Sequence, residues 1–408
     1  MSAALEVFEL STTAEIEAFA EQWTALHVAC PGELFATPAW FLAWLSAFGI
    51  DKQPRVLKVT CGAQLVGVLP LVQSTVRRRP WLSMHHAHME DLRFIKKGNR
   101  RGCLLPVRQL CVAANLQSGS IRGGWIAASG MAAEVLSATA QHLASRRDWD
   151  MLVLPALRSD LDGDFRAAMQ HGGLIVESRS NLTTLYGLTP EPWEAYYRRR
   201  SRHFRKRFNA AERDLGKLGA VRCVTTTRSE DHPAALARMF LLAERSWKER
   251  PRTGQNWHLP MTPTAVKFYT ELCARAAACE GAIFHEIYVA ERLVAVLFGM
   301  VDQHTVYLLQ TYYDAAFEAG SPGRLLMREL IGWAAAHNVR WIDFNGNSAY
   351  VRMFASEPYS FGQCWVFRNN GYSGILQRTM ELVEGMRRTF SGLCTRTPAL
   401  PLASGELE

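Results

Sequence analysis

Several features that define common protein classes are missing from this 408-residue sequence. Its nine cysteines include no C-x-x-C pair, so neither a zinc knuckle nor a disulfide framework is indicated. No run of about 18 apolar residues occurs, which excludes an ordinary membrane-spanning helix. The first residues form neither a basic nor an apolar segment, so no secretory signal is expected. We therefore expect a cytoplasmic protein with reduced thiols and no integral membrane segment.

The composition that is present describes a globular chain. Hydrophobic residues make up 48% of the sequence and charged residues 21%, and the length suits about two domains. The net charge is +8, and the basic residues are clustered between positions 198 and 207 and again between positions 77 and 101. Such clusters favour an anionic partner, which is a nucleotide-like cofactor, an acidic lipid surface or a nucleic acid.

A weak internal repeat indicates two related halves. Residues 64–69 (QLVGVL) resemble residues 292–297 (RLVAVL), and each lies in a strand–turn–strand pattern, at 55–72 and 284–301. Each half continues with a helix that precedes a strand, over 135–154 in the first and 322–344 in the second. This order predicts a mixed α/β fold of two tandem units. We place them at residues 1–180 and 181–375, with a C-terminal helix and tail at 376–408.

The second half opens with a basic and aromatic segment. Its apolar residues are spaced three and four apart, which predicts one amphipathic helix with a buried stripe of Trp193, Tyr197, Arg200, Phe204, Phe208, Ala211 and Leu215. The face of this helix opposite the buried stripe is basic, with Arg198, Arg202, Arg205 and Lys206. This basic face is either solvated or in contact with an anionic substrate or RNA. Aromatic residues on the apolar stripe are expected to be buried and not to stack on bases, which weakens the nucleic-acid interpretation.

A short motif near position 320 predicts a helix start that suits an anion. Ser321 has the chemistry of an N-cap and Pro322 that of a first helical position. Gly320 and Gly323 leave the backbone amides approachable, and a helix N-terminus attracts negative charge. The motif therefore indicates a pyrophosphate and a coenzyme A-type ligand, unless it is an ordinary capped helix.

The histidines near position 86 allow a second type of site. Imidazoles and carboxylates within residues 85–91 (HHAHMED) are good metal ligands. Adjacent histidines on one strand face opposite sides, however, and no second ligand cluster is visible. We expect no metal. We favour a loop in which His86 and His88 contact the acceptor, with ordinary surface histidines as the alternative.

The order of several motifs resembles the Gcn5-related N-acetyltransferase (GNAT) superfamily. More narrowly, it resembles the BioF2-like or CelD-like branch, which is related to the Fem aminoacyl transferases. The resembling stretches are residues 193–197, 244–248, 295–299, 312–314, 321–326, 343–346 and 350–354. The resemblance implies one or two mixed-sheet acyltransferase units, an acetyl-CoA or other acyl-CoA cosubstrate, and a role in exopolysaccharide or cell-envelope synthesis.

Two positions depart from the pattern of the superfamily. Its pyrophosphate loop resembles R/Q-x-x-G-x-G/A, and counting back from Gly323 places Ser321 at a glycine position and Glu318 at the basic or amide position. An acid there repels phosphate. The branch often has Tyr-Lys after its D-F-x-x-G segment, whereas Val351 follows Tyr350 here and the next cation is Arg352.

The resemblance also implies roles for individual residues. Tyr350 matches a tyrosine that protonates the leaving thiolate, and backbone amides of Leu309, Gln310 and Thr311 match those that hold the thioester carbonyl. Asp343 is a candidate base or amine-orienting carboxylate, or else a structural carboxylate that caps the Gly346 loop. The expected cofactor-binding residues also include Gly320, Ser321, Gly323 and Arg324. The expected substrate-binding residues are Trp247, Lys248, Tyr312, Asp314, Arg352, Glu357, His86 and His88.

Three hypotheses for function remain open at this stage. The first is an acyl-CoA-dependent N-acyltransferase that acts on a small-molecule acceptor, such as an amino sugar or another envelope precursor. The second is a Fem-like transferase that uses aminoacyl-tRNA, which the basic segment and Glu318 favour. The third is a catalytically degenerate subunit of a polysaccharide assembly system. The sequence leaves the oligomeric state open.

Overall fold

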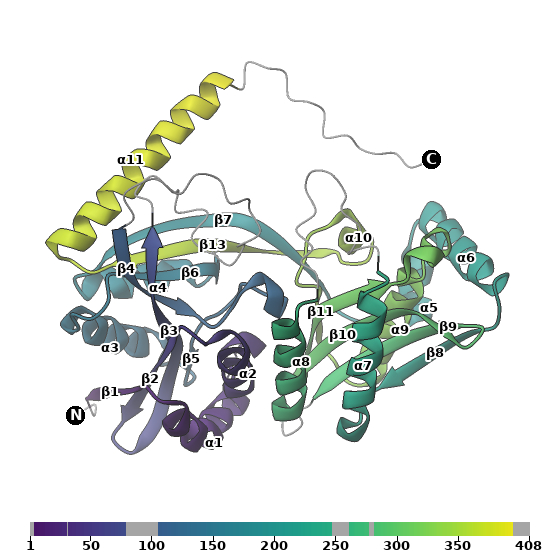
Figure 1. Ribbon diagram of the computed structural model, residues 1–408, viewed down its shortest axis with the longest axis horizontal. Coiled ribbons are helices and arrows are strands. Elements are labelled where there is room, and N and C mark those ends of the chain that lie inside the picture. The colour runs from purple at the N-terminus through teal and green to yellow at the C-terminus, as the bar shows by residue number, and fades with distance from the viewer. Residues whose placement is uncertain (1–3, 31, 79–104, 247–260, 277–280, 395–408) are drawn as a thin grey trace.

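The computed structural model describes residues 4–30, 32–78, 105–246, 261–276 and 281–394 (Figure 1). The expected substrate-binding residues Trp247, Lys248, His86 and His88 lie outside this part of the chain. The described strands form one sheet in the order β1-β2-β3-β4-β6-β13-β7-β12-β11-β10-β9-β8, with β5 paired to β3. The mixed α/β fold expected from the sequence is confirmed.

The first unit runs from β1 to β7. Its elements are β1 (Leu5–Leu10), α1 (Thr13–Ala29), η1 (Leu34–Ala36), α2 (Pro38–Phe48), β2 (Gln53–Cys61), β3 (Gln64–Arg78), β4 (Leu105–Val112), η3 (Leu116–Ser118), β5 (Ile126–Ala127), α3 (Ala132–Ser145), β6 (Met151–Arg158), α4 (Asp162–His171) and β7 (Ile175–Leu188).

The second unit follows from α5 to β13, and α11 ends the described chain. Its elements are α5 (Trp193–Arg199), α6 (Arg202–Gly216), β8 (Val221–Thr226), η4 (Ser229–Asp231), α7 (His232–Ala243), α8 (Pro263–Ala276), β9 (Ala282–Val289), β10 (Arg292–Asp302), β11 (Thr305–Tyr313), η6 (Ala315–Gly320), α9 (Gly323–Ala336), β12 (Trp341–Asp343), α10 (Ala349–Arg352), β13 (Glu357–Phe367) and α11 (Gly371–Cys394).

The two units repeat the same order of elements, as the sequence repeat predicts. The second unit begins with α5 and α6. From β1 and from β8 onward, each unit then has a strand, two helices, a hairpin, a strand, a helix, a strand, a helix and a long final strand. The hairpins β2–β3 and β9–β10 contain the two related sequence segments. The final strands β7 and β13 pair with each other and extend across both units in Figure 1. The end of β7 pairs with β12, and the second half of β13 pairs with β6. The boundary expected at residue 180 therefore lies inside a strand that both units share.

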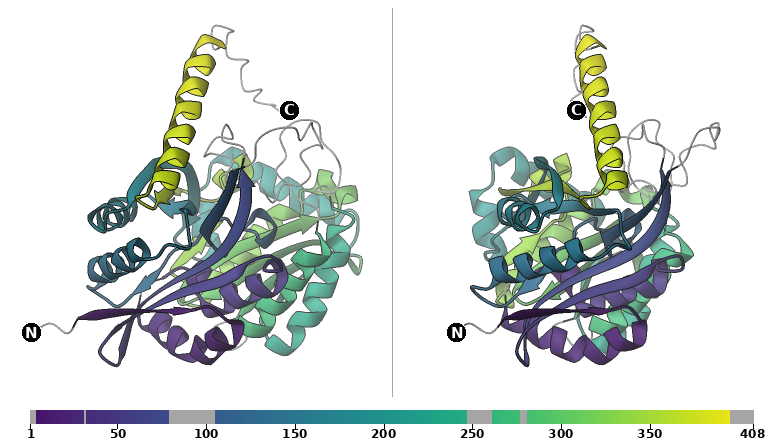
Figure 2. Two further views of the ribbon diagram at one scale, coloured as in Figure 1. Left: turned by 60° about the vertical axis from the view of Figure 1, so that its left-hand side comes forward. Right: turned by 90° about the vertical axis from the view of Figure 1, so that its left-hand side faces the viewer.

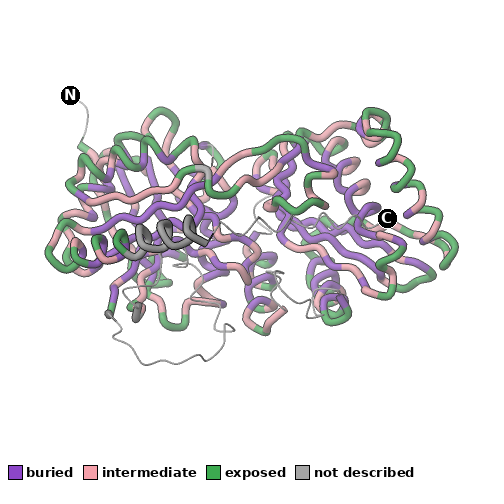
Figure 3. Tube along the Cα trace, turned by 90° about the horizontal axis from the view of Figure 1, so that it is seen from above, coloured by how far each residue is buried: buried purple, intermediate pink, exposed green. Residues whose placement is uncertain are grey.

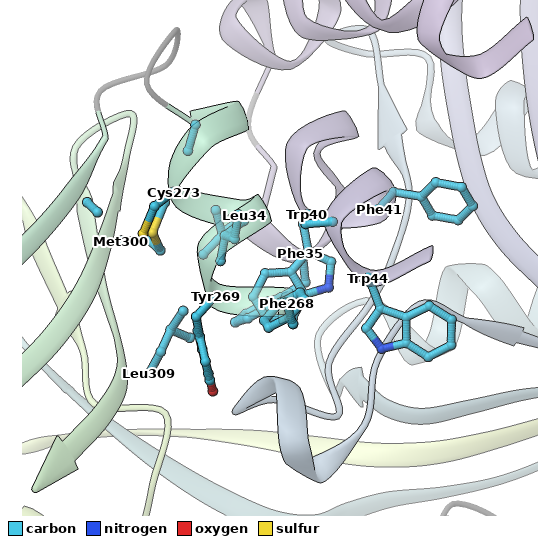
Figure 4. Packing of buried hydrophobic residues seen from close by; sticks show 14 of the residues in the cluster. Leu34, Phe35, Trp40, Phe41, Trp44, Phe268, Tyr269, Cys273, Met300 and Leu309 are labelled. Carbon is cyan, nitrogen blue, oxygen red and sulfur yellow. The ribbon is translucent and has the colours of Figure 1, made fainter. Parts of the chain in front are cut away.

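A common apolar core joins the units. Helices α1 and α2 of the first unit and α7 and α8 of the second contribute to one buried cluster, in which Trp40 and Phe268 lie edge to face with ring centroids 5.1 Å apart (Figure 4). Helices α5, α6 and α9 pack in a separate cluster with β9–β12. Helices α3 and α4 share a third cluster with strands of the first unit. Figure 3 shows the buried strands of both units between more exposed helices.

The basic aromatic segment forms two helices, which corrects the single helix expected from its spacing. Arg200 is extended, with φ −74° and ψ 153°, and the Ser201 side chain accepts a hydrogen bond from the Phe204 amide to cap α6. Because the helix restarts there, Tyr196 is buried in place of the expected Tyr197. Phe204, Phe208, Ala211 and Leu215 are buried as expected, whereas Trp193 and Arg200 are only partly buried.

Helix α11 extends away from the body of the molecule (Figure 2). Its first turns are attached through Leu376 and Met380, which are buried beside Trp365 of β13. Among the described residues, none of the helices is both long and apolar enough to cross a membrane.

Candidate functional site

Strands β11 and β12 part in the middle of the second unit. They pair in parallel at only three positions, ending at Tyr307 and Asp343, whereas β11 continues to Tyr313 against β10. The parting coincides with a bulge, because Gly299 lies opposite Leu308 and Phe298 lies opposite Gln310, so that Leu309 is an extra residue. A bulge of this kind bends its strand and re-aims the backbone groups. The sequence-predicted segment Leu309–Thr311 therefore lies where β11 has left β12.

The space opposite the bulge is tight and favours glycine. A Cβ atom at Gly299 would lie 3.0 Å from the Tyr307 carbonyl oxygen and 3.3 Å from side-chain carbons of Ile283 and Val306. Side chains rarely tolerate such short contacts with a backbone oxygen in a packed sheet. Gly299 thus lets the three strands β9, β10 and β11 stay close at the point where β11 turns from β12.

The first unit contributes polar groups beside the bulge. Gln310 donates a hydrogen bond to the Tyr269 hydroxyl at 2.6 Å, and Tyr269 donates to the Gln117 carbonyl at 3.2 Å. Tyr312 donates to the Gln310 side-chain oxygen at 2.9 Å. Gly119 completes the contact in a left-handed conformation with φ 85°, and a Cβ there would lie 3.2 Å from the Leu309 carbonyl oxygen. The turn at η3 therefore forms one side of the parting.

Asp343 is held in a buried ion pair with the first unit. Its Oδ2 accepts a hydrogen bond from Arg122 at 2.6 Å, and its Oδ1 accepts from the Asn345 amide at 2.8 Å and from the Tyr359 hydroxyl. Arg122 also donates to Glu33, and its guanidinium lies over the Phe35 and Phe361 rings. Asp343, the base candidate from the sequence, thus accepts hydrogen bonds from three donors. Its proposed part in the reaction stays a prediction.

Tyr350 reaches the start of α9. Its hydroxyl donates to the Gly323 carbonyl oxygen at 2.6 Å, and its ring lies 5.3 Å from that of Phe354. Burial raises the pKa of the Tyr350 hydroxyl well above its usual range, although the nearby Arg324 acts in the opposite direction. The hydroxyl therefore keeps its proton at neutral pH, as a group that donates a proton must.

The start of α9 differs from the sequence expectation in its cap. Ser321 lies in the left-handed region with φ 46°, and the N-cap is Pro322, which makes no side-chain capping bond. The amides of Arg324 and Leu325 already donate to the Ser321 and Pro322 carbonyls at 3.0 and 3.1 Å. These two N–H groups are therefore used within the turn, and the expected binding of an anion at this helix start stays a prediction.

The two glycines of the motif serve close packing. A Cβ atom at Gly320 would lie 2.6 Å from a methyl carbon of Leu215 in α6. One at Gly323 would lie 2.9 Å from the Tyr350 hydroxyl oxygen. The glycines therefore allow Leu215 of α6 and Tyr350 of α10 to contact the helix start directly.

Arg324 has a buried guanidinium group that is only partly hydrogen-bonded. The side chain is 7% exposed, and one terminal nitrogen lies 3.8 Å from the Met353 sulfur while the other has no hydrogen-bond partner. Burial lowers the pKa of the Arg324 guanidinium, and the charge of Arg207 lowers it further, while Tyr350 raises it. A buried cation in this state is costly unless an anion joins it.

The remaining predicted residues are spread along the edges of this region. Asp314 caps η6 by accepting from the Ala316 amide and pairs with Arg292 at 2.5 Å. Burial alone would raise the pKa of Asp314, but these two donors lower it. Glu357 accepts from the Thr189 amide at 2.9 Å, and Arg352 is exposed on α10. Among them, only Tyr312 lies in the hydrogen-bond chain at the bulge.

Sequence reasoning missed residues that reach this region from far along the chain. Arg122 and Gln117 come from the first unit and Tyr269 from α8 of the second, and they contact residues between 41 and 221 positions away. The one sequence signal near Arg122 is the set of glycines in the segment Gly119–Gly124, which indicates an unusual turn. It does not indicate that Arg122 contacts Asp343.

The comparisons with known proteins agree with this geometry. The sequence matches the family described as "Acetyltransferase (GNAT) domain" over residues 202–359, which contain β8–β12 and the Tyr350 helix. A search of curated proteins found no match. The fold is similar to that of FemX, with 12% identity, a TM-score of 0.57, and coverage of 89% of this chain and 98% of that one.

Two further solved structures share the fold. One is the C-terminal domain of a putative lysylphosphatidylglycerol synthetase from Agrobacterium fabrum, with 8% identity, a TM-score of 0.51, and coverage of 90% and 96% of the two chains. The other is a protein of unknown function from Bacteroides thetaiotaomicron, with 10% identity, a TM-score of 0.50, and coverage of 89% and 100%. Residues 202–359 therefore match a GNAT acetyltransferase domain, which is the domain of an acyltransferase, and the chain shares its two-unit fold with FemX.

Proposed function

We propose that the protein transfers an acyl group, in the first instance acetyl, from acyl-CoA to an amine of an amino sugar or another cell-envelope precursor. The observation that carries this proposal is the parting of β11 from β12 at the Leu309 bulge, inside the segment that matches the acetyltransferase family. Backbone N–H groups beyond the last β11–β12 pair, in the Leu309–Thr311 segment, are the donors that the thioester carbonyl needs as charge develops on its oxygen.

Tyr350 supplies the proton for the leaving thiolate in this proposal. The raised pKa keeps its hydroxyl protonated, and its bond to the Gly323 carbonyl fixes the ring at the start of α9. When the donor is bound, the hydroxyl would give its proton to the departing sulfur in place of its bond to the Gly323 carbonyl. General acid groups of this kind contribute about 10²- to 10⁴-fold to the rate.

In this proposal Asp343 has a structural role and does not take a proton from the acceptor. Because Arg122, Tyr359 and the Asn345 amide occupy its oxygens, the carboxylate fixes the end of β12 and the turn that follows. The incoming amine then reacts from its neutral fraction, which is small at neutral pH for an alkyl amine with a pKa of about 10.4. An acceptor with a less basic amine is therefore expected to react faster at pH 7.

The test is acceptor-dependent release of free CoA. Purified protein is incubated with acetyl-CoA and a panel of amino sugars, and both CoA and the acetylated product are quantified by mass spectrometry. We expect product with at least one amine and none with the matched hydroxy sugar. Acetyl-CoA that stays intact with every acceptor, in a protein that also fails to bind it, would contradict the proposal and favour a non-catalytic subunit.

A second candidate donor is aminoacyl-tRNA, favoured by the basic surface of α5 and α6. Arg198, Arg202 and Lys206 are exposed, and no carboxylate of the described chain pairs with them. Salt-sensitive binding of tRNA that falls on replacing Arg202 and Lys206 with Gln, together with transfer of the aminoacyl group, would support this donor over acyl-CoA.

A further inference from the structure

Glu33 of the first unit belongs to a set of charges that is not balanced. Arg122 lies between two carboxylates, with its Nη1 bonded to Asp343 and its Nη2 bonded to Glu33. Arg158 approaches Glu33 at 4.0 Å, but its Nε and Nη2 donate to Asp160 at 3.0 and 2.7 Å. With two guanidinium groups against three carboxylates, the set carries one negative charge in excess.

The excess charge lies at Glu33, because Asp343 is the better satisfied of the two carboxylates on Arg122. Asp343 accepts hydrogen bonds from three donors, and its side chain is 2% exposed. Among the described residues, Glu33 accepts a hydrogen bond from Arg122 alone, and its side chain is 22% exposed. Glu33 is also the N-cap residue of η1 but makes no capping hydrogen bond there. This carboxylate therefore has acceptor capacity to spare and can be reached from solvent.

The hydroxyl of Tyr307 lies within electrostatic reach of Glu33 and has an unmet hydrogen-bonding capacity. Tyr307 is 5% exposed, and its hydroxyl makes no hydrogen bond to any residue that the structure describes. Burial and then the charge of Glu33 raise the pKa of this hydroxyl well above its usual range, while Arg122 lowers it. The Tyr307 ring meets that of Phe35 edge to face, with centroids 5.3 Å apart. Because buried hydroxyls are normally hydrogen-bonded, this one indicates a polar group that the described chain does not supply.

Both groups lie at the point where β11 and β12 part. Tyr307 is opposite Asp343 at the last pair between these strands, and the Leu309 bulge follows two residues later. Arg122 joins Glu33 to Asp343 at the same point. In the proposed reaction the bulge holds the thioester carbonyl, so the acceptor has to bring its nucleophile to this end of the paired strands.

We propose that Glu33 and Tyr307 bind the amino group of the acceptor. The inference rests on the proposed acyl transfer and adds to it the residues that select an amine. An amino group donates N–H bonds, which a carboxylate and a phenol oxygen accept, and its protonated form supplies the positive charge that the set around Glu33 lacks. Once the amine has lost that proton, its remaining N–H bonds still hold it while the lone pair is free for the carbonyl. A hydroxyl acceptor offers a single O–H bond and no charge, so the site favours amines over alcohols.

The experiment compares glucosamine with glucose, which differ only in an amino group against a hydroxyl. Dissociation constants of both sugars and of acetyl-CoA are measured by calorimetry for the full chain as wild type, Glu33→Gln and Glu21→Gln. Glu21 is the control, because it is an exposed carboxylate on α1 of the same unit. We expect the wild type to bind glucosamine more tightly than glucose. Glu33→Gln should weaken glucosamine about tenfold and leave glucose and acetyl-CoA unchanged, and Glu21→Gln should bind all three as the wild type does.

Tyr307→Phe tests the second group, because it keeps the ring against Phe35 and removes only the hydroxyl. It should weaken glucosamine severalfold and keep the acetyl-CoA affinity of the wild type, and it decides the question should Glu33→Gln fail to fold. A wild type that binds glucosamine no more tightly than glucose overturns the amine site. Unchanged glucosamine affinity in Glu33→Gln also overturns it, as does an equal loss for all three ligands, which would show a general disturbance of the ion pairs.

The outcomes separate this site from the proposed reaction. Acetylation of glucosamine with an unchanged KM in Glu33→Gln leaves the proposed function standing and rejects the site. Glucosamine binding that depends on Glu33, in a protein that acetylates no amine, supports the site and rejects the reaction. A wild type that acetylates no amine and does not prefer glucosamine to glucose rejects both.

Discussion

Arg122 of the first unit and Asp343 of the second form a buried ion pair, with 2.6 Å between Nη1 and Oδ2. Their side chains are 3% and 2% exposed. The pair joins the glycine-rich segment of one unit to the last residue at which β12 still pairs with β11. The two units are therefore coupled at the point where the candidate site opens, and the first unit is part of that site.

Removal of one partner of this pair should destabilise the protein strongly. Arg122→Met leaves Asp343 buried without its cation, and the expected loss is about 3–5 kcal/mol of unfolding free energy. Asp343→Asn should cost less, because the side-chain oxygen can still accept from the Asn345 amide.

Urea unfolding measures the free energy of unfolding of both variants. The exposed pair Arg222–Glu291 is the control, and Arg222→Met should cost less than about 1 kcal/mol. A loss for Arg122→Met as small as this control would refute the coupling.

Tyr350→Phe separates proton donation from binding. The variant should lose about 10²-fold or more in kcat while the dissociation constant for acetyl-CoA stays within about twofold of the wild type. Loss of the hydrogen bond to Gly323 should cost about 1 kcal/mol of stability, which unfolding experiments report separately. Steady-state kinetics with a fixed acceptor provide the test. An unchanged kcat would exclude Tyr350 as the acid.

A side chain at Gly187 should lower the free energy of unfolding, because the Trp341 ring lies against this position. It lies on β7 opposite Asp343 and Glu357, and a Cβ there would come within 1.9 Å of the Trp341 ring. We expect Gly187→Ala to destabilise the protein by several kcal/mol, and Trp341→Leu to recover part of this loss when the two are combined. Gly163→Ala is the control, since open space surrounds that position in α4. Additive effects of Gly187→Ala and Trp341→Leu would show that the clash is not the cause.

Acid sensitivity should depend on His285. Burial, with a smaller effect of nearby His337, lowers the pKa of His285 from 6.5 to about 3. The unfolded chain therefore binds the proton first as the pH falls, so the folded state loses stability below pH 6.5 by about 1.4 kcal/mol per pH unit, until the folded pKa is reached. Above pH 6.5 the group has no effect.

His285→Leu should remove this part of the pH dependence. Urea unfolding at pH 7.5 and pH 5.0 measures it, and the difference between the two values should be smaller in the variant than in the wild type. His171→Gln, at an exposed position on α4, serves as the control and should keep the slope of the wild type. Equal slopes in all three proteins would contradict the buried neutral state of His285.

The tandem architecture could be predicted from the sequence because its signals are local. The hairpins around residues 64–69 and 292–297 and the helix–strand pairs that follow them are encoded in short periodic segments. The pairing of β7 with β13 could not be predicted, since their partners lie more than 150 residues apart and either strand alone suits an edge or a central position. The boundary placed at residue 180 therefore lies inside a strand.

The candidate site was predictable only where its residues are neighbours in the sequence. The Leu309 segment, Tyr350 and the start of α9 follow from motifs, although the left-handed Ser321 moves the cap by one residue. Arg122 and Arg200 could not be assigned in this way. Arg122 meets Asp343 across 221 positions, and Arg200 occupies a helix break that its periodicity conceals. The contacts of Arg122 with Asp343 and Glu33, and of Arg200 with the Met353 carbonyl, form only in the folded chain.

Calorimetric titration of the full chain with acetyl-CoA tests the central claim most directly. We predict one binding site per chain, because the parted strands with the bulge and the contact of Tyr350 with the start of α9 occur together only in the second unit of the described chain. The affinity should be micromolar and should fall about tenfold or more in Arg324→Met. No binding by the folded wild type would contradict acyl-CoA as the donor, and attention would then turn to aminoacyl-tRNA.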